Sequence, residues 1–187
     1  MSILAALWQP IILSAVLVFI LSAIIHMALK YHNSDYTRLP NEDAVRAAIR
    51  SGNPAPGRLY VFPYAPSMKE MESPEMKQKY IEGPIGLLTL RRPGPMSMTP
   101  ALTQWFLFTL LVSIFVAYVA SHSLPPGADY LRVFRIVGAT AFLTYAVGHL
   151  PASIWMGKPW GVAAKEVFDG LLYALVTAGT FGWLWPG

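Results

Sequence analysis

The chain of 187 residues contains no cysteine. This absence excludes disulfide bonds, thiolate zinc sites and iron–sulfur clusters with ordinary cysteine ligation. A metal site in this protein would have to use histidine, carboxylate or methionine ligands. The absence does not indicate a redox compartment.

Charged residues are also scarce. They make up 13% of the chain, whereas soluble domains typically carry about 25%. Hydrophobic residues reach 55%, which predicts a membrane protein. Ten of the fourteen Lys and Arg residues lie between Lys30 and Arg92. The pI of about 9.4 therefore reflects one basic region, and without a nucleic-acid-binding signature we expect no nucleic-acid partner.

Long apolar runs are abundant. A bilayer core of about 30 Å needs roughly 20 apolar residues per helix. The first run lacks a basic residue before it and is followed by Lys30, which is typical of an uncleaved anchor rather than a secretory signal. The predicted fold class is an all-α membrane protein with four transmembrane helices and a small α+β insertion between the first and second. The predicted helices are 8–29, 101–121, 131–150 and 164–185.

The distribution of basic residues predicts the orientation. Residues 30–100 hold ten Lys and Arg residues and 151–165 hold two more, whereas the opposite side offers only Arg132 and Arg135. Because basic loops stay on the cytoplasmic side, we expect 30–100 to be cytoplasmic and both termini periplasmic. The predicted location is the bacterial inner membrane.

The insertion 30–100 carries signals of local order. The stretch "NEDAVRAAIRSG" predicts a helix with Asn41 as N-cap and Gly52 as stop signal. The stretch "SPEMKQKYIEG" predicts a second helix from Ser73 to Gly83, and "RLYVFPY" and "IGLLTLRR" predict short strands. A unit of about 60 residues buries little core alone. We therefore expect it to lie against the membrane or a neighbouring subunit.

Each predicted transmembrane helix has one small or polar face, as helix packing in lipid favours. The faces are Ala15, Ser22 and His26; Thr109, Ser113, Ala117 and Ala120; Arg135, Gly138, Phe142, Tyr145 and His149; and Glu166, Asp169, Tyr173, Thr177 and Thr180. Helical rise places several of these residues in the inner leaflet. The predicted intramembrane polar cluster is His26, His149, Glu166, Asp169, Tyr145 and Tyr173.

Three interpretations of this cluster stay open. In the first, Asp169 faces the bundle interior and pairs with His26, His149 or Lys165, which satisfies groups that are costly unpaired in lipid. In the second, the polar faces form a proton or ion path. In the third, His26 and His149 bind a metal ion or haem, because imidazole is a common ligand of iron, copper and zinc.

Five methionines of the insertion region add a weaker indication. Thioethers favour Cu(I), although methionines also pack small domains and interfaces, and a cytoplasmic location favours packing. The residues are Met68, Met71, Met76, Met96 and Met98.

No enzyme signature is present: the sequence has no glycine-rich phosphate loop, nucleophile elbow or H-E-x-x-H motif. His26 and His32 are six residues apart, a spacing that does not place them on one helix face. We therefore predict a non-catalytic accessory subunit or self-associating component of a membrane assembly, with the bilayer and a homo-oligomer or other membrane subunits as partners. The alternatives are a proton, ion or small-solute channel or transporter, and a haem- or metal-binding subunit. No cofactor is favoured.

Three stretches carry a resemblance to known sequences: "IIHMALKYHNSDYTRLPNEDAVRAAIR", "LPPGADYLRVF" and "DGLLYALVTAGTFGWLWP". Through them the chain resembles, over its whole length, an uncharacterised family of bacterial multi-pass membrane proteins of unknown function. The resemblance implies a membrane location and transfers no activity, cofactor or site residue.

Overall fold

The computed structural model describes residues 3–187 and divides them into two compact units. The first unit combines residues 3–36 with 97–187, and the second comprises Thr37–Met96. The chain is mostly helical, and in the described residues the only sheet has two strands.

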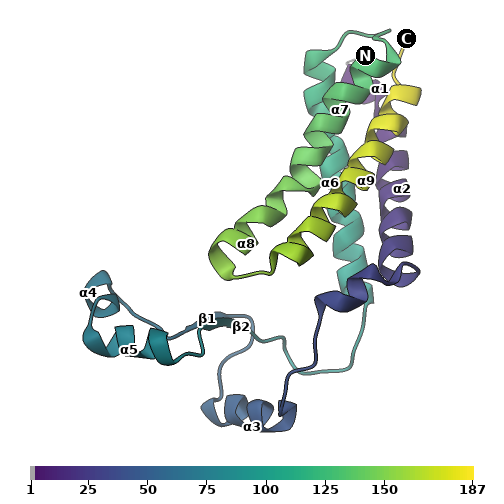
Figure 1. The fold of residues 1–187 in the computed structure, drawn as a ribbon. Coiled ribbons are helices and arrows are strands. Elements are labelled where there is room, and N and C mark those ends of the chain that lie inside the picture. The colour runs from purple at the N-terminus through teal and green to yellow at the C-terminus, as the bar shows by residue number, and fades with distance from the viewer. Residues whose placement is uncertain (1–2) are drawn as a thin grey trace. The chain divides into compact units, whose positions relative to one another are not determined.

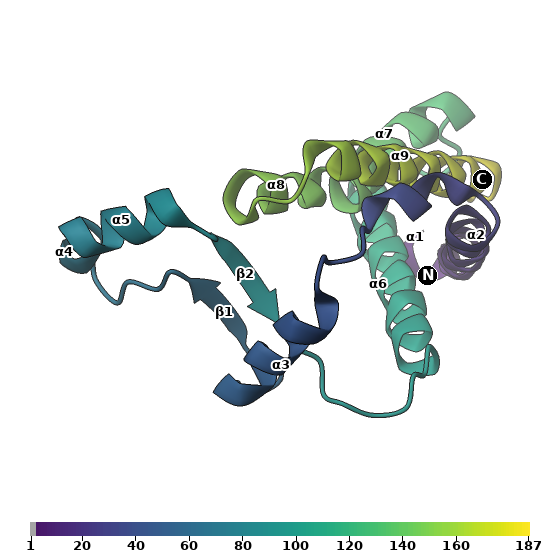
Figure 2. The ribbon, with the colours of Figure 1, turned by 60° about the horizontal axis from the view of Figure 1, so that its bottom comes forward.

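Four long helices of the first unit lie side by side: α2 (Trp8–Met27), α6 (Thr99–Ser123), α7 (Tyr130–Tyr145) and α9 (Trp160–Trp183) (Figure 1). Around the bundle, α2 contacts α6 and α9, and α7 contacts the same two helices. The short helices α1 (Ile3–Ala6) and α8 (Leu150–Met156) lie at opposite ends of the bundle (Figure 1). The first described residues and the C-terminal residues lie at the α1 end (Figures 1 and 2).

Small residues let the helices approach closely. A Cβ on Gly170 of α9 would lie 2.7 Å from the Cα of Ala146, and one on Gly138 of α7 would lie 3.3 Å from the Cβ of Ala178. Between α2 and α6, the hydroxyl oxygens of Ser14 and Ser113 lie 3.0 Å apart. Close backbone approach and hydroxyl bonds of this kind are how helices associate in lipid.

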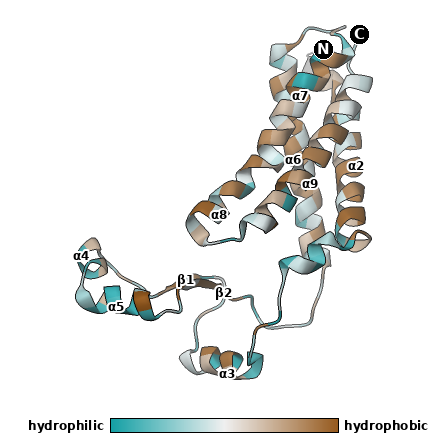
Figure 3. Ribbon diagram, in the orientation of Figure 1, coloured by the Kyte–Doolittle hydropathy of each residue, from teal (hydrophilic) through white to brown (hydrophobic). Residues whose placement is uncertain are grey.

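Three helical segments are long and apolar enough to cross a membrane: Trp8–Met27, Thr99–Ser123 and Tyr130–Met156. Hydrophobic colours dominate the bundle helices (Figure 3), and many large apolar side chains, such as Ile20 and Phe115, point outward. The predicted fourth span, 164–185, coincides with most of α9, but α9 is not among the three segments. The reason is its polar N-terminal half, which contains Lys165, Glu166 and Asp169.

The first two predicted spans match the structure to within two residues at each end. The predicted third span, 131–150, is shorter than the helical segment, which continues to Met156 with a break inside it. Helix α7 ends at Tyr145, the 3-10 helix η2 covers Val147–His149, and α8 follows. Pro151 explains the break, because proline cannot donate to the carbonyl four residues earlier and its ring clashes with it.

The second unit contains α3 (Glu42–Gly52), β1 (Leu59–Phe62), α4 (Met68–Met71), α5 (Pro74–Glu82) and β2 (Gly86–Thr89). The strands pair antiparallel, with Leu59 opposite Thr89. Ser73 caps α5 through its bond from the Met76 amide, as predicted. Asn41 precedes α3 with a left-handed backbone (φ 51°), but its side chain makes no capping hydrogen bond. The predicted N-cap interaction of Asn41 is therefore wrong.

The boundary of the insertion also differs from the predicted 30–100. Residues 30–36 belong to the first unit, where Lys30–Asp35 form the 3-10 helix η1. Polar side chains of η1 form hydrogen bonds with α9, as described below, and for this reason η1 belongs to the first unit and not to the insertion. Within Thr37–Met96, all of which the structure describes, Met76 is the only buried residue.

Candidate functional site

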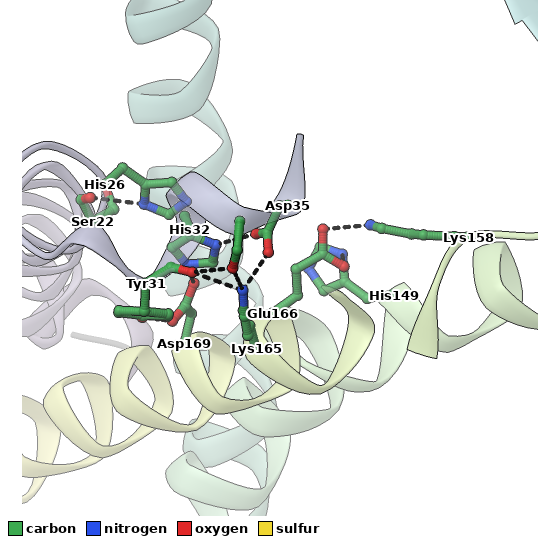
Figure 4. A network of polar contacts seen from close by, with 11 residues as sticks. Ser22, His26, Tyr31, His32, Asp35, His149, Lys158, Lys165, Glu166 and Asp169 are labelled. Atoms are coloured by element: carbon green, nitrogen blue, oxygen red, sulfur yellow. Dashed lines mark hydrogen bonds and ion pairs between the residues drawn. The ribbon is translucent and has the colours of Figure 1, made fainter. Parts of the chain in front are cut away.

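The candidate site forms where η1, just after α2, meets the first turns of α9 (Figure 4). Lys165 and Asp169 are four residues apart on α9 and so share one face of that helix. From η1, Tyr31, His32 and Asp35 contact this face. The site therefore joins two segments that are about 130 residues apart in the sequence.

Asp169 is buried, with a side-chain exposure of 4%, and both of its carboxylate oxygens are bonded. The Tyr31 hydroxyl donates to Oδ1, and His32 Nε2 lies 2.8 Å from Oδ2. A buried carboxylate needs such partners, because an unpaired charge away from water is very costly. Asp169 therefore holds η1 against α9 through two side chains.

Lys165 and Asp35 form the second link between these segments. Lys165 Nζ lies 2.5 Å from Asp35 Oδ1 and 2.7 Å from both the Tyr31 carbonyl and the Ser34 hydroxyl, so its three protons all have acceptors. The other Asp35 oxygen lies 2.6 Å from His32 Nδ1. With His32 protonated, two positive and two negative charges balance within one cluster.

Three groups of η1 have shifted pKa values. Burial and the hydrogen bond to Asp169 raise the pKa of Tyr31, which keeps the phenol a neutral donor. Burial alone would lower the pKa of His32, but the bonds to Asp35 and Asp169 outweigh it and the pKa is raised. Hydrogen bonds from Lys165 and then His32 lower the pKa of Asp35. These shifts favour imidazolium and carboxylate in contact.

His26, at the end of α2, stacks on His32. The ring centroids are 4.6 Å apart and the planes differ by 7°. Nδ1 of His26 lies 3.0 Å from the Ser22 carbonyl oxygen. Potential ligand atoms of His26, His32 and Asp169 all lie within 4.8 Å of one another, so these are the residues that could hold a metal ion.

Glu166 organises a smaller cluster beside the first. Its Oε1 accepts a bond from Lys158, and His149 Nδ1 lies 3.4 Å from Oε2. The second distance and its geometry leave Oε2 without a hydrogen-bond partner among the described residues. His149 thus lies next to Glu166 and outside the group of metal-ligating atoms, so the predicted pair of His26 and His149 is not the pair that the structure brings together.

A cavity of about 320 Å³ adjoins both clusters. Five of the six residues of the predicted polar cluster line it: His26, His149, Glu166, Asp169 and Tyr173. Its other walls are mainly apolar and include Phe19, Leu102 and Trp105.

Tyr145, the sixth residue of the predicted cluster, is not part of the lining. It packs edge-to-face on Tyr173 with ring centroids 5.7 Å apart. Both tyrosine hydroxyls are buried and have no hydrogen-bond partner among the described residues.

The predicted polar faces agree with the packing on three of the four helices. The small faces of α2 and α6 and the Asp169, Tyr173, Thr177 and Thr180 face of α9 are buried, apart from His26, which is exposed. On α7, Arg135 is exposed, and the buried face runs through Val133, Val137, Ala141 and Tyr145. Arginine is too strongly hydrated to share that apolar interface without a partner.

Sequence reasoning missed the contributions of Tyr31, His32 and Asp35. It assigned them to the insertion and compared histidine spacings only along one helix. The signal that could have found them is the polar run "KYHNSD" directly after the first span, in which His32 and Asp35 are three residues apart.

Chemically, the cluster can clamp η1 to α9, hold a proton on His32, or bind a metal ion through two imidazoles and a carboxylate. Comparisons with protein-family models, with curated proteins and with solved structures found no match.

Proposed function

We propose that the protein is a four-helix membrane component of the bacterial inner membrane, with α9 as its fourth span. The outward side chains of α9, among them Phe168, Leu171 and Leu175, are exposed and apolar. Its polar groups Lys165 and Asp169 are paired with η1 near one end of the helix, which lowers their cost in lipid. With four spans, both termini lie on one side.

The proposed orientation has Thr37–Met96 in the cytoplasm and the termini in the periplasm. The excess of basic residues in this unit and in the α8–α9 connection supports that orientation through the positive-inside rule.

Within the membrane, we assign the protein the role of a non-catalytic subunit that associates with itself or with other membrane proteins. The observation that carries this proposal is the lack of a core in Thr37–Met96. Met76 is its only buried residue, whereas large apolar side chains such as Ile81 and Ile85 are 79% and 58% exposed. A unit of about 60 residues with so little burial needs a covering surface.

The η1 cluster suits the same role. Its charges are compensated within the chain, and it fixes the segment that leads out of α2 toward Thr37–Met96.

The middle of the bundle favours packing over a transport path, because Ser113 and Thr177 have no exposed surface. A path for ions would require wetted polar groups at this depth.

The proposal is tested by the native mass of the full-length protein, extracted with its lipids into nanodiscs. We expect a multiple of the 20.6 kDa chain mass, or a stoichiometric complex with a second membrane protein. A double variant Ile81→Glu, Ile85→Glu should release the monomer, whereas Ser51→Glu, at an exposed polar position of the same unit, should not. A wild-type protein that is monomeric and bound only to lipid would contradict the proposal.

A further inference from the structure

The cluster at the start of α9 has the composition of a metal site, and this inference is independent of the proposed assembly role. We propose that His26, His32 and Asp169 bind one divalent transition-metal ion, with Zn²⁺ as the representative case. Their candidate ligand atoms lie within 4.8 Å of one another, although the residues come from α2, η1 and α9. Imidazole and carboxylate together suit zinc and its neighbours in the first transition row.

The hydrogen bonds of the two histidines determine which ring nitrogen of each is left for a metal ion. A carbonyl oxygen can only accept, so the contact of His26 Nδ1 with Ser22 at 3.0 Å places the proton on Nδ1. The Nε2 lone pair of neutral His26 then remains for a metal ion. Metal-binding histidines characteristically donate their second N–H to a backbone carbonyl or a carboxylate in this way.

His32 has the corresponding arrangement with a carboxylate. Its Nδ1 lies 2.6 Å from Asp35 Oδ2, and Lys165 holds the other Asp35 oxygen at 2.5 Å. Asp35 is thus an anchored second partner that orients the ring and leaves Nε2 directed to Asp169. In both histidines Nδ1 contacts an oxygen acceptor, and ligand atoms of both lie within 4.8 Å of one carboxylate, a pattern that a purely structural ion pair does not require.

Metal binding replaces the contact between His32 and Asp169 and separates the stacked rings of His26 and His32. In the structure, a proton of His32 Nε2 occupies the 2.8 Å contact with Asp169 Oδ2, and the metal ion takes the place of that proton. The parallel rings of His26 and His32 cannot both direct in-plane lone pairs at one ion, so His26, whose residue is exposed, turns out of the stack. Asp169 Oδ1 keeps its bond from Tyr31.

Three protein ligands leave a tetrahedral ion with one further position. His26 and Asp169 also line the cavity of about 320 Å³, so this position is reached from the cavity. Glu166 lines the same cavity, and one of its carboxylate oxygens is buried without a hydrogen-bond partner among the described residues.

The test is equilibrium dialysis of the chelator-stripped, full-length protein in detergent against Zn²⁺, with bound metal measured per chain. A parallel titration with Co²⁺ reports the ligand geometry through its visible spectrum. We expect one ion per chain and loss of stoichiometric binding in His26→Ala, a change at an exposed position. Asp35→Asn should weaken binding about 10–100-fold, as is typical when a group that orients a metal-binding histidine is lost.

Two histidine variants serve as matched controls. His122→Ala, at the end of α6, and His149→Ala, which lines the cavity outside the ligand group, should both retain one ion per chain. Binding that persists in the double variant His26→Ala, His32→Ala would overturn the proposal, as would a wild-type protein that binds no more metal than His26→Ala. Loss in His149→Ala with retention in His32→Ala would place the metal between His26 and His149 instead.

Discussion

Asp169 joins η1 to α9 through both of its carboxylate oxygens. Its two oxygens bind Tyr31 and His32, and the side chain is almost inaccessible. Because both partners come from η1, a change at Asp169 affects the contact between segments far apart in the sequence. The adjacent pair of Asp35 and Lys165 shares this role through His32.

Replacement of Asp169 by asparagine tests this dependence. The amide keeps the shape but loses one acceptor oxygen and the charge opposite His32, so we expect the free energy of unfolding to fall by about 1–3 kcal/mol, as for a lost bond to a charged group. Chemical denaturation in detergent, followed by circular dichroism, measures this. Asp129→Asn, at an exposed position before α7, is the matched control. Equal stability of the two variants would contradict the account.

The importance of Asp169 could be predicted from the sequence, but its partners Tyr31 and His32 were missed. A carboxylate inside an apolar helix must be paired, so its burial in the bundle could be expected from physical chemistry alone. The partners of Asp169 could not be predicted, because they lie on a six-residue 3-10 helix that folds back onto α9. Such a short element has no hydrophobic periodicity to indicate its direction.

Among the elements, the end of α7 and α9 approach each other closely at Gly170. Gly170 lies against Ala146, where α7 ends and the chain turns into η2. The position directly follows Asp169, so close packing here also determines how α9 presents that side chain to η1.

The variant Gly170→Ala tests this approach. Its Cβ would lie 2.7 Å from the Cα of Ala146, and backbone cannot move aside as a flexible side chain can. We expect a loss of about 1–3 kcal/mol in the free energy of unfolding, as for overpacking. Gly161→Ala, where nothing lies within 4 Å, should be neutral or slightly stabilising because alanine favours helix. Thermal unfolding of both variants side by side gives the comparison, and a stable Gly170→Ala protein would contradict close packing.

Long apolar periodic segments could be predicted well from the sequence, and local breaks could not. The first two spans match within two residues, because length and hydropathy determine them. The break between α7 and α8 has a sequence signal in Pro151, but the continuation of the helical segment to Met156 depends on packing against α9. Asn41 occupies the cap position without the cap bond, because its left-handed backbone directs the side chain elsewhere.

For the whole molecule, the first prediction is its orientation in the membrane. The chain has no cysteine, so a single introduced cysteine reports its own exposure without background. Ser51→Cys, exposed in α3, should react with a membrane-impermeant maleimide only after the inner membrane is opened. Labelling of Ser51→Cys from the periplasmic side of intact cells would reverse the proposed orientation.

The proposed assembly role requires a partner that covers the apolar surface of Thr37–Met96, and two cysteines within that unit can report this cover. Ile81 is 79% exposed in the single chain, and Ser51 is exposed as well. In opened native membranes we expect Ile81→Cys to react at least about tenfold more slowly with a soluble maleimide than Ser51→Cys, since burial in an interface excludes water and reagent. The difference should disappear once detergent has dissociated the protein to monomers. Equal rates in native membranes would show Ile81 uncovered and contradict the assembly role.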